Sequence, residues 1–418
     1  MSNDKNEPTI KTFGCRLNFY ETEVIRKHAL EAGLSSDVVI FNTCAVTKEA
    51  ERQARQAIRR VKKDNPDSNI IVTGCSAQID PQKYADMKEV TRVIGNDLKL
   101  KAESWSSKAP VMVNDIMSVK ETASHLIEGY EDRSRAFLQI QNGCDHRCTF
   151  CIIPFGRGKS RSVPIAQIAR QVKTLSKGGY NEIVFTGVDV TSYGEDLNGK
   201  PTLGKMITEV LELVPELVRL RLSSLDPAAI DDDLWNLIEN EPKLCPHLHL
   251  SLQAGDDMIL KRMKRRHTRD DVIDLRARAR ELRPDMVFGA DIIAGFPTET
   301  EEMFVNTLAL VEECDITFLH VFPYSERDGT PAARIPSQVQ VSVRKERAAR
   351  LRALGDTLLG KLLQRSAGKE FNVIVEKGGI GKTETFLPVR LFDEYETGQL
   401  IRIQTLDVKD GMLEGISV

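Results

Sequence analysis

The chain has 418 residues, 41% hydrophobic and 28% charged, with a formal net charge of -3. This length predicts about three domains, and the composition excludes a disordered, collagen-like or small disulfide-stapled protein. The balanced charge requires any nucleic-acid site to be a local patch. The N-terminus is polar and acidic, unlike a signal peptide, and no segment approaches the ~18 apolar residues of a membrane span. We therefore expect a cytoplasmic protein with reduced cysteines and no membrane partner.

The N-terminal part, residues 1–102, repeats one pattern, a short β-type run that ends just before a cysteine. The runs are Thr9–Phe13 before Cys15, Val38–Asn42 before Cys44, and Ile70–Thr73 before Cys75. Segments rich in alanine, glutamate, arginine and lysine separate them and favour helix. Right-handed crossovers make such strands parallel and bring their carboxyl ends to one edge of the sheet. The three cysteines are therefore expected to meet there.

A polar stretch at residues 103–135 predicts a linker, after which residues 136–340 resume the alternation of strand and helix. The β-type runs are Phe137–Gln141, Ile183–Thr186, Val218–Leu222, Leu248–Leu252, Val287–Ile293 and Phe318–Phe322. Six such units predict a partial parallel (β/α) barrel, shorter than the closed eight-unit form, with its chemistry at the carboxyl ends of the strands.

Residues 341–366 predict a basic helical connector, and residues 367–418 have the composition of a small antiparallel β domain. Small β-barrels often bind oligonucleotides, and a structural cap on the larger barrel is an equal alternative. The fold class is therefore α/β, with a parallel N-terminal domain, a central partial barrel and a small C-terminal β-barrel.

The most specific motif is a loop with Cys144, Cys148 and Cys151, directly after the first predicted barrel strand. A zinc site normally has four ligands, and a fourth is not obvious nearby. Three thiolates around a four-iron cluster would leave one iron without a protein ligand and open to a substrate. A structural zinc loop with a distant histidine is the alternative.

These motifs carry a resemblance to a known family. The loop GCDHRCTFCIIPFGRG resembles the radical S-adenosylmethionine superfamily, and the words FGCRLN and FNTCAVTKEAERQARQ resemble the methylthiotransferases. LSLQAGDD, IIAGFPTET, HVFPYSERDGTPAA and a terminal domain similar to the TRAM β-barrel extend the resemblance over nearly the whole chain. GCRLN, NTCAVT and RGKSRS are similar to the branch that methylthiolates N6-threonylcarbamoyladenosine next to the tRNA anticodon.

The resemblance implies a transferase with two 4Fe-4S clusters and S-adenosylmethionine as cofactors. The radical cluster would be held by Cys144, Cys148 and Cys151, and an auxiliary, sulfur-handling cluster by Cys15, Cys44 and Cys75. No catalytic residue beyond these ligands is implied. The implied partners are the tRNA anticodon loop, a reducing electron donor and a sulfur donor.

Residues at the predicted strand ends are the candidates to bind S-adenosylmethionine: Gly187, Asp189, Ser223, Ser224, Gln253, Asp291 and Gly295. Residues of these types at strand ends cap helices or close turns at least as often as they contact a ligand. The basic segment Lys261–Arg269 is the candidate RNA contact through Lys264, Arg265 and Arg266, with the Arg344–Arg365 helix as a second candidate. A solvated helix face is the simpler interpretation of such a charge run.

Several alternatives stay open at this point. His247 and His249 face the same side of one strand, which fits either a metal pair or histidines that line the barrel. Cys245 and Cys314 are expected to fill core positions. The alternative substrates are isopentenyladenosine in tRNA and ribosomal protein S12, and a different class of function is a non-catalytic RNA-binding protein with structural zinc.

Overall fold

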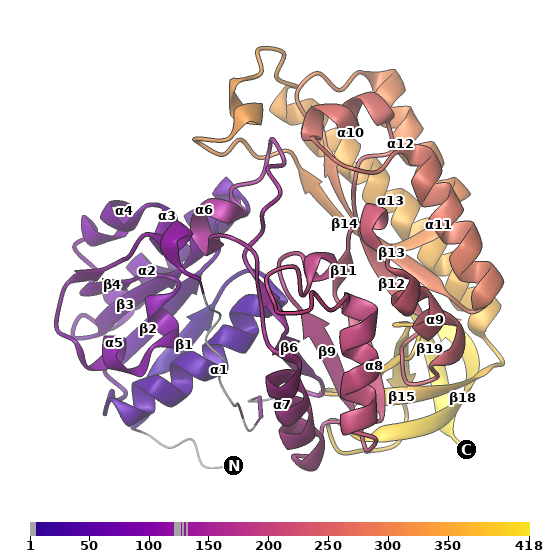
Figure 1. Ribbon diagram of the computed structural model, residues 1–418, viewed down its shortest axis with the longest axis horizontal. Helices are drawn as coiled ribbons and strands as arrows, with labels where there is room; N and C mark the ends of the chain where they lie inside the picture. The colour runs from indigo at the N-terminus through magenta and orange to yellow at the C-terminus, as the bar shows by residue number, and fades with distance from the viewer. Residues whose placement is uncertain (1–5, 121–126, 128, 131–132) are drawn as a thin grey trace. The chain divides into compact units, whose positions relative to one another are not determined.

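The computed structural model describes residues 6–120, 127, 129–130 and 133–418. The chain divides into two compact units (Figure 1). Unit 1 contains residues 1–127, 141–163 and 325–333, and unit 2 contains residues 128–140, 164–324 and 334–418. In the described ranges, no helix combines the length and the apolar character that crossing a membrane requires.

Unit 1 is built on a parallel sheet with the strand order β1-β2-β3-β4-β5. Its strands are β1 Thr9–Thr12, β2 Val38–Thr43, β3 Asn69–Gly74, β4 Arg92–Ile94 and β5 Val111–Met112. Its helices are α1 Arg16–Glu31, α2 Lys48–Asp64, α3 Cys75–Ile79, α4 Pro81–Ala85 and α5 Ala102–Ser106, with 3-10 turns η1 Leu98–Leu100 and η2 Ile116–Ser118. The predicted βαβαβ pattern is confirmed.

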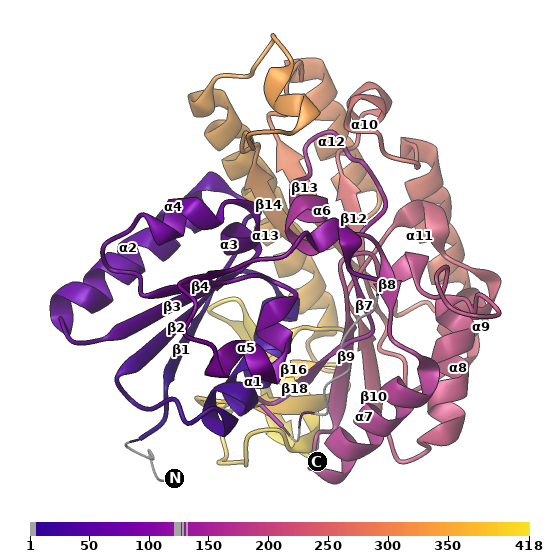
Figure 2. The same ribbon diagram turned by 60° about the vertical axis from the view of Figure 1, so that its left-hand side comes forward.

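Alternate residues of the sheet pack on its two faces, as expected for parallel strands covered on both sides. Phe41 and Val72 pack with Ile58 of α2 and Tyr84 of α4. Ile40 and Ile71 pack on the opposite face, with Ile25 of α1 and Trp105 of α5. Figure 2 shows α2 and α4 on one side of the sheet and α1 and α5 on the other.

The cysteine loop also belongs to unit 1. The antiparallel strands β7 Gln141–Asn142 and β8 Arg161–Ser162 close its base, and helix α6 Ile153–Arg157 lies within it. This grouping differs from the predicted boundaries, which placed the loop in a barrel domain of residues 136–340. The predicted linker 103–135 also differs, because β5 and η2 lie inside it and β5 pairs with β4.

Unit 2 contains a partial parallel barrel. Its strands are β6 Ala136–Gln139, β9 Glu182–Thr186, β10 Arg219–Leu222, β11 Ser224–Leu225, β12 His247–Gln253, β13 Val287–Ala294 and β14 Ile316–Pro323. They form the parallel sheets β6-β9-β10 and β11-β12-β13-β14. Strands β10 and β11 are separated by Ser223 alone, so the two sheets continue one another. The predicted six-unit barrel is confirmed.

Helices follow the barrel strands and cover their outer face (Figure 1). They are α7 Ile165–Lys177, α8 Leu203–Leu213, α9 Asp232–Asn240, α10 Asp257–Met263, α11 Arg269–Leu282 and α12 Glu301–Glu313. Shorter 3-10 turns of this unit are η3 Val190–Ser192 and η4 Pro227–Ala229, whereas η5 Pro331–Arg334 begins in the last segment of unit 1. This arrangement leaves the inner face of the strands for polar side chains that come from neighbouring strands.

Helix α13, Val341–Ser366, has the bounds predicted for the connector and leads into a closed barrel with the order β15-β16-β17-β19-β18. The strands are β15 Glu370–Glu376, β16 Ile380–Thr383, β17 Pro388–Leu391, β18 Leu400–Lys409 and β19 Met412–Ser417. The predicted small β domain is confirmed, with one difference: β17 and β19 pair in parallel and close the barrel.

A buried carboxylate stabilises the amino end of the larger barrel. Glu182 accepts hydrogen bonds from Arg221 Nε at 2.7 Å and from Arg219 Nη1 at 3.1 Å. Arg219 also donates to the carbonyl oxygen of Asn372 in β15. Burial alone would raise the pKa of Glu182, but the positive charges of Arg221, Arg135 and Arg219 outweigh burial and lower it to about 2.

We expect Glu182→Gln to reduce the unfolding free energy near neutral pH by about 3 kcal/mol, the equivalent of this pKa shift. A lowered pKa contributes stability above the unfolded-state value of 4.5, and this contribution is lost as pH falls toward 2. The difference between wild type and variant should therefore shrink below pH 4.5. Urea unfolding across this pH range measures it, and a difference independent of pH would contradict the assignment.

Candidate functional site

Three cysteines lie at neighbouring strand ends of unit 1. Cys15 caps α1 just after β1, Cys44 follows β2, and Cys75 begins α3 directly after β3. Burial, followed by the negative charges of the Cys15 and Cys75 thiolates, raises the pKa of Cys44 to about 12. The three sulfur atoms are therefore near one another, and the prediction that the topology brings these cysteines to one sheet edge is confirmed.

Two glycines allow these turns to approach so closely. Gly14 and Gly74 precede Cys15 and Cys75 and have positive φ angles of 100° and 97°. A Cβ atom at Gly14 would lie 2.7 Å from Cys44 Cβ, and one at Gly74 would lie 2.3 Å from the carbonyl oxygen of Thr43. A side chain at either position would push the strand ends apart.

A buried ionic network lies beneath these cysteines. Lys99 Nζ donates to Glu21 Oε2 at 2.7 Å, and Arg157 Nη1 donates to Glu21 Oε1 at 2.8 Å, with all three side chains almost fully buried. Two cations and one carboxylate leave a net positive charge. Burial raises the pKa of Cys75, whereas Arg157 and Lys99 act to lower it. The network therefore favours negative charge on the sulfur atoms.

The loop with the other three cysteines has a rigid base. Cys144 donates its backbone N–H to the carbonyl oxygen of Gly158 at 3.1 Å, and Cys151 donates to that of Cys148 at 3.1 Å. Gly143 has a φ of 74°, and a Cβ there would lie 1.8 Å from the carbonyl oxygen of Lys159. The cysteines of the loop are half-buried, so they remain partly accessible to solvent.

The two cysteine sets approach each other through the end of this loop. Asn96 Nδ2 donates to the carbonyl oxygen of Gly156 at 2.7 Å and lies 3.5 Å from Cys75 Sγ. A Cβ at Gly156 would lie 3.2 Å from Cys75 Cβ. A cavity of about 350 Å³ adjoins this region and is lined by residues that include Ile79 and Ile152. The separate domains expected for the two sets are thus replaced by one shared unit.

The seven residues predicted to bind S-adenosylmethionine lie toward the carboxyl ends of the barrel strands. Gly187 follows β9, Ser223 and Ser224 lie at the break between β10 and β11, and Gln253 ends β12. Asp189 accepts hydrogen bonds from Thr191 and Ser192 and so also closes a turn. Gly295 donates its N–H to Glu299 Oε2 at 2.8 Å. Their contact with a cofactor stays a prediction.

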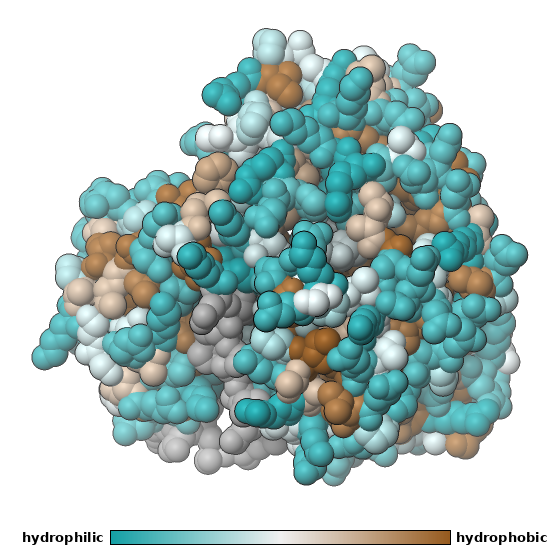
Figure 3. Space-filling view, viewed as in Figure 1, coloured by the Kyte–Doolittle hydropathy of each residue, from teal (hydrophilic) through white to brown (hydrophobic). Residues whose placement is uncertain are grey.

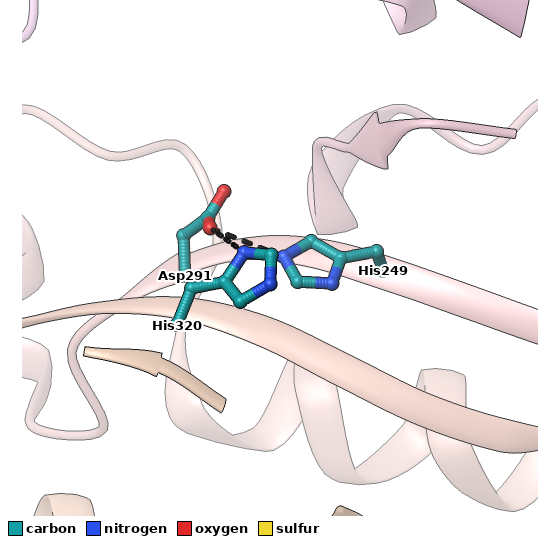
Figure 4. A group of neighbouring side chains, drawn as sticks. All are labelled: His249, Asp291 and His320. Carbon is teal, nitrogen blue, oxygen red and sulfur yellow. Dashed lines mark hydrogen bonds and ion pairs between the residues drawn. The ribbon is translucent and has the colours of Figure 1, made fainter. Parts of the chain in front are cut away.

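Asp291 is engaged by two histidines from the neighbouring strands (Figure 4). Its Oδ1 atom lies 3.1 Å from His249 Nε2 and 3.2 Å from His320 Nδ1, and Ser224 Oγ donates to its Oδ2 at 3.3 Å. Burial would raise the pKa of Asp291, but its contacts with His249 and His320 lower it well below the usual range. His247, by contrast, packs against the rings of Phe318 and Phe386.

The predicted RNA contacts differ in exposure. Lys264 and Arg266 are exposed, whereas the side chain of Arg265 is 8% exposed, pairs with Asp226 and donates to the carbonyl oxygen of Ser251. Arg265 therefore holds the loop after α10, Arg266 also donates to Asp226 at 3.2 Å, and the contact of these residues with RNA stays a prediction. The face drawn in Figure 3 is largely hydrophilic, with scattered hydrophobic residues.

Two arginines of the connector helix α13 are also engaged in contacts within the protein. Arg347 pairs with Glu299 at 2.8 Å, and Arg344 donates to the carbonyl oxygen of Tyr324, both from buried positions. These two arginines hold α13 against the larger barrel and do not offer their charge to RNA. Cys245 and Cys314 are buried, as predicted.

Comparison with known proteins decides the family. Residues 138–311 match the Radical SAM superfamily and residues 8–95 match Uncharacterized protein family UPF0004. The chain is 55% identical over 98% of its length to the threonylcarbamoyladenosine tRNA methylthiotransferase MtaB of Rickettsia prowazekii, of which it covers 97%. The chain belongs to the radical S-adenosylmethionine methylthiotransferase family. The resemblance seen in the sequence is confirmed.

Two further proteins, one similar in sequence and one similar in structure, are less similar to this chain. The tRNA-2-methylthio-N(6)-dimethylallyladenosine synthase of Staphylococcus epidermidis is 33% identical over 90% of the chain and 76% of that protein. The solved radical S-adenosylmethionine methyltransferase TsrM of Kitasatospora setae, with cobalamin and a [4Fe-4S] cluster bound, has a TM-score of 0.53. At 14% identity, covering 78% of this chain and 77% of that one, it shares the fold alone.

Membership in the radical S-adenosylmethionine methylthiotransferase family implies a 4Fe-4S cluster and S-adenosylmethionine. The residues present fit such a group. Each cysteine set supplies three thiols that are not tied in disulfides. The Cys144 loop supplies them on a backbone held at both ends, and the strand-end set supplies them above a buried network with excess positive charge, which suits an anionic cluster.

Proposed function

We propose that this methylthiotransferase acts on tRNA and converts N6-threonylcarbamoyladenosine next to the anticodon to its 2-methylthio derivative. The observation that carries the proposal is the 55% identity, over 98% of the chain, to a relative named for this substrate. The named dimethylallyladenosine relative is much less similar, at 33% identity. An adenosine in a single-stranded loop suits RNA-binding enzymes, because its base can leave the stack.

In this proposal Cys144, Cys148 and Cys151 hold a 4Fe-4S cluster with one iron open to S-adenosylmethionine. When reduced, the cluster supplies the electron that cleaves S-adenosylmethionine to the radical that removes hydrogen from adenine C2. The contribution of the chain is positional. The β7–β8 pair and Gly143 fix the backbone of the loop, and the half-buried thiols leave its outer side accessible.

A second 4Fe-4S cluster would be held by Cys15, Cys44 and Cys75 and would handle sulfur. The buried cations Lys99 and Arg157 favour the thiolate form of its ligands. The contacts of Asn96 and Gly156 with Cys75 support the presence of two clusters with separate roles in one reaction, because they bring the two ligand sets together within one unit.

S-Adenosylmethionine would be held at the strand ends by the predicted set Gly187, Asp189, Ser223, Ser224, Gln253 and Gly295. Asp291 is left out, because both of its oxygen atoms are engaged. Lys264 and Arg266 would contact tRNA phosphates. A reducing electron donor and a sulfur donor complete the reaction, which we place in the cytoplasm.

The experiment is an anaerobic turnover assay with the reconstituted enzyme on three substrates, read by mass spectrometry of the digested products. We expect methylthiolation of tRNA that carries N6-threonylcarbamoyladenosine, and rates lower by a factor of ~10⁴ or more with isopentenylated tRNA. The reason is that a pocket built for the polar arm leaves its polar groups unpaired against an apolar one. Ribosomal protein S12 should remain unmodified.

Each result has a separate meaning. Preferential modification of isopentenyladenosine would uphold tRNA as the substrate but assign a different modified adenosine. Modification of S12 would overturn the assignment of RNA as the substrate. The control is tRNA without either arm. Iron and sulfide analysis of the same preparation tests the alternative of a structural zinc protein, for which no iron is expected.

A further inference from the structure

The triad of His249, Asp291 and His320 lies on the inner face of the barrel in unit 2 (Figure 4). The three residues come from the adjacent parallel strands β12, β13 and β14, and Asp291 is the direct register partner of His320. His249 is the register partner of Gly289, which lies two residues before Asp291 on the same face. The fold therefore brings the triad together through its strand register, without a flexible loop.

Glycine at position 289 makes room for the buried ring. A Cβ atom there would lie 2.6 Å from His249 Nδ1, so any other residue would displace the imidazole. With Gly289 in place, His249 Nε2 points to Asp291 Oδ1. His320 reaches the same oxygen with its Nδ1 atom, and its ring lies beside that of His249, with the ring centroids 4.6 Å apart. Two imidazoles thus converge on one carboxylate oxygen.

The spacing of these atoms fits the ligands of one metal ion. One ligand atom from each residue lies within 4.8 Å of the other two. Two ligands that are each about 2.1 Å from an ion are about 3.0–3.4 Å apart in octahedral or tetrahedral geometry. The separations from Asp291 Oδ1 to the two imidazole nitrogens, 3.1 and 3.2 Å, agree with this.

We propose that His249, Asp291 and His320 bind one divalent transition-metal ion, separate from the iron of the clusters. Two imidazoles and one carboxylate suit Zn²⁺, Mn²⁺ or Fe²⁺ and leave coordination positions open. Ser224, hydrogen bonded to Asp291 Oδ2, orients the carboxylate from outside the ligand set. This gives Asp291 a role different from the cofactor contact predicted from the sequence.

The open positions face the accessible side of the triad, because the side chain of His320 is 55% exposed while that of His249 is 4% exposed. Oxygen ligands would occupy them. On the basis of the proposed function, this ligand is the carboxylate of the threonylcarbamoyl arm. The dimethylallyl arm has no oxygen atom and cannot take this place.

The first test is metal content. Untagged protein, with its clusters reconstituted so that the cysteines are occupied, is incubated anaerobically with Zn²⁺, desalted and analysed by plasma mass spectrometry. We expect one zinc ion per chain in wild type and its loss in Asp291→Asn and His320→Ala. His28→Ala, a change in α1 of unit 1, is the matched control and should retain the ion. His320 is half exposed, so its removal should leave the melting temperature nearly unchanged.

Gly289→Ala is a second variant, which changes no ligand but displaces His249 and should weaken zinc binding at least tenfold. Absence of zinc in wild type, or equal zinc in wild type and all the triad variants, would overturn the metal site. If the triad acts without a cation, either of these two results is expected.

The second test uses Co²⁺ as a probe of the open positions. The visible spectrum of the cobalt-loaded protein, recorded as a difference against the cobalt-free protein, should change when N6-threonylcarbamoyladenosine is added, and should not change with N6-dimethylallyladenosine. Zinc binding without this spectral change would uphold the metal site and overturn its contact with the substrate arm. The turnover assay is read independently, so failure here is distinguishable from failure of the proposed function.

Discussion

Cys148→Ala is expected to abolish release of 5'-deoxyadenosine from S-adenosylmethionine under anaerobic, reducing conditions. The thiolate of Cys148 is one of three protein ligands in the proposed radical site, and a cluster with two remaining ligands is not held in place. Iron should fall from about eight to about four atoms per chain, because the strand-end set is unchanged. Chromatography of the reaction mixture and iron analysis measure the two effects.

The iron content separates loss of one cluster from loss of the fold. Both cysteine sets lie in unit 1, so a misfolded variant would lose all of its iron. Cys314→Ala is the matched control, since Cys314 is a buried cysteine at the end of α12 in unit 2. It should keep both clusters and full activity. Wild-type release of 5'-deoxyadenosine by Cys148→Ala would exclude Cys148 as a ligand.

Arg157→Met is expected to shift the reduction potential of the proposed strand-end cluster to a more negative value. Methionine fills the buried space without charge, and loss of a positive charge beside the sulfur atoms makes addition of an electron less favourable. Removal of one partner from a buried ion pair should also cost about 3–5 kcal/mol of unfolding free energy. Glu21 would keep Lys99 alone as its cation.

The measurement is a redox titration followed by electron paramagnetic resonance. It is made in a protein whose Cys144, Cys148 and Cys151 are alanine, so that the strand-end cluster alone contributes. Arg147→Met is the matched control, because Arg147 is an exposed arginine of the same loop that donates to backbone carbonyl groups. An unchanged potential together with an unchanged melting temperature would show that Arg157 does not act on the cluster.

The local patterns of the sequence predicted most of the fold. Runs such as Val38–Asn42 are hydrophobic and β-branched, and each is followed by a helical segment, so β1 to β3 and the barrel strands could be placed from periodicity. The meeting of Cys15, Cys44 and Cys75 follows from the topology. Strand β5 contains two residues, Val111 and Met112, and no periodic pattern can reveal an element of that length.

The contacts that complete the site join residues far apart in the sequence, so local sequence patterns could not predict them. Arg157 and Glu21 are 136 residues apart, and nothing local to either residue predicts their pairing or the grouping of the cysteine loop with unit 1. Alternation predicted that His249 lies on the same side of its strand as His247. It could not supply His320, because the register between β13 and β14 depends on packing across the whole sheet.

The construction of unit 1 from three chain segments affects its biogenesis. Its last segment ends at residue 333, far beyond the first, which ends at residue 127. At about 5–20 residues per second, the ribosome needs roughly 10–40 s to add the residues in between. During this time the strand-end thiols belong to an incomplete unit and are open to oxidants and to competing metal ions. Iron-sulfur assembly on this chain must therefore come late in synthesis or after release from the ribosome.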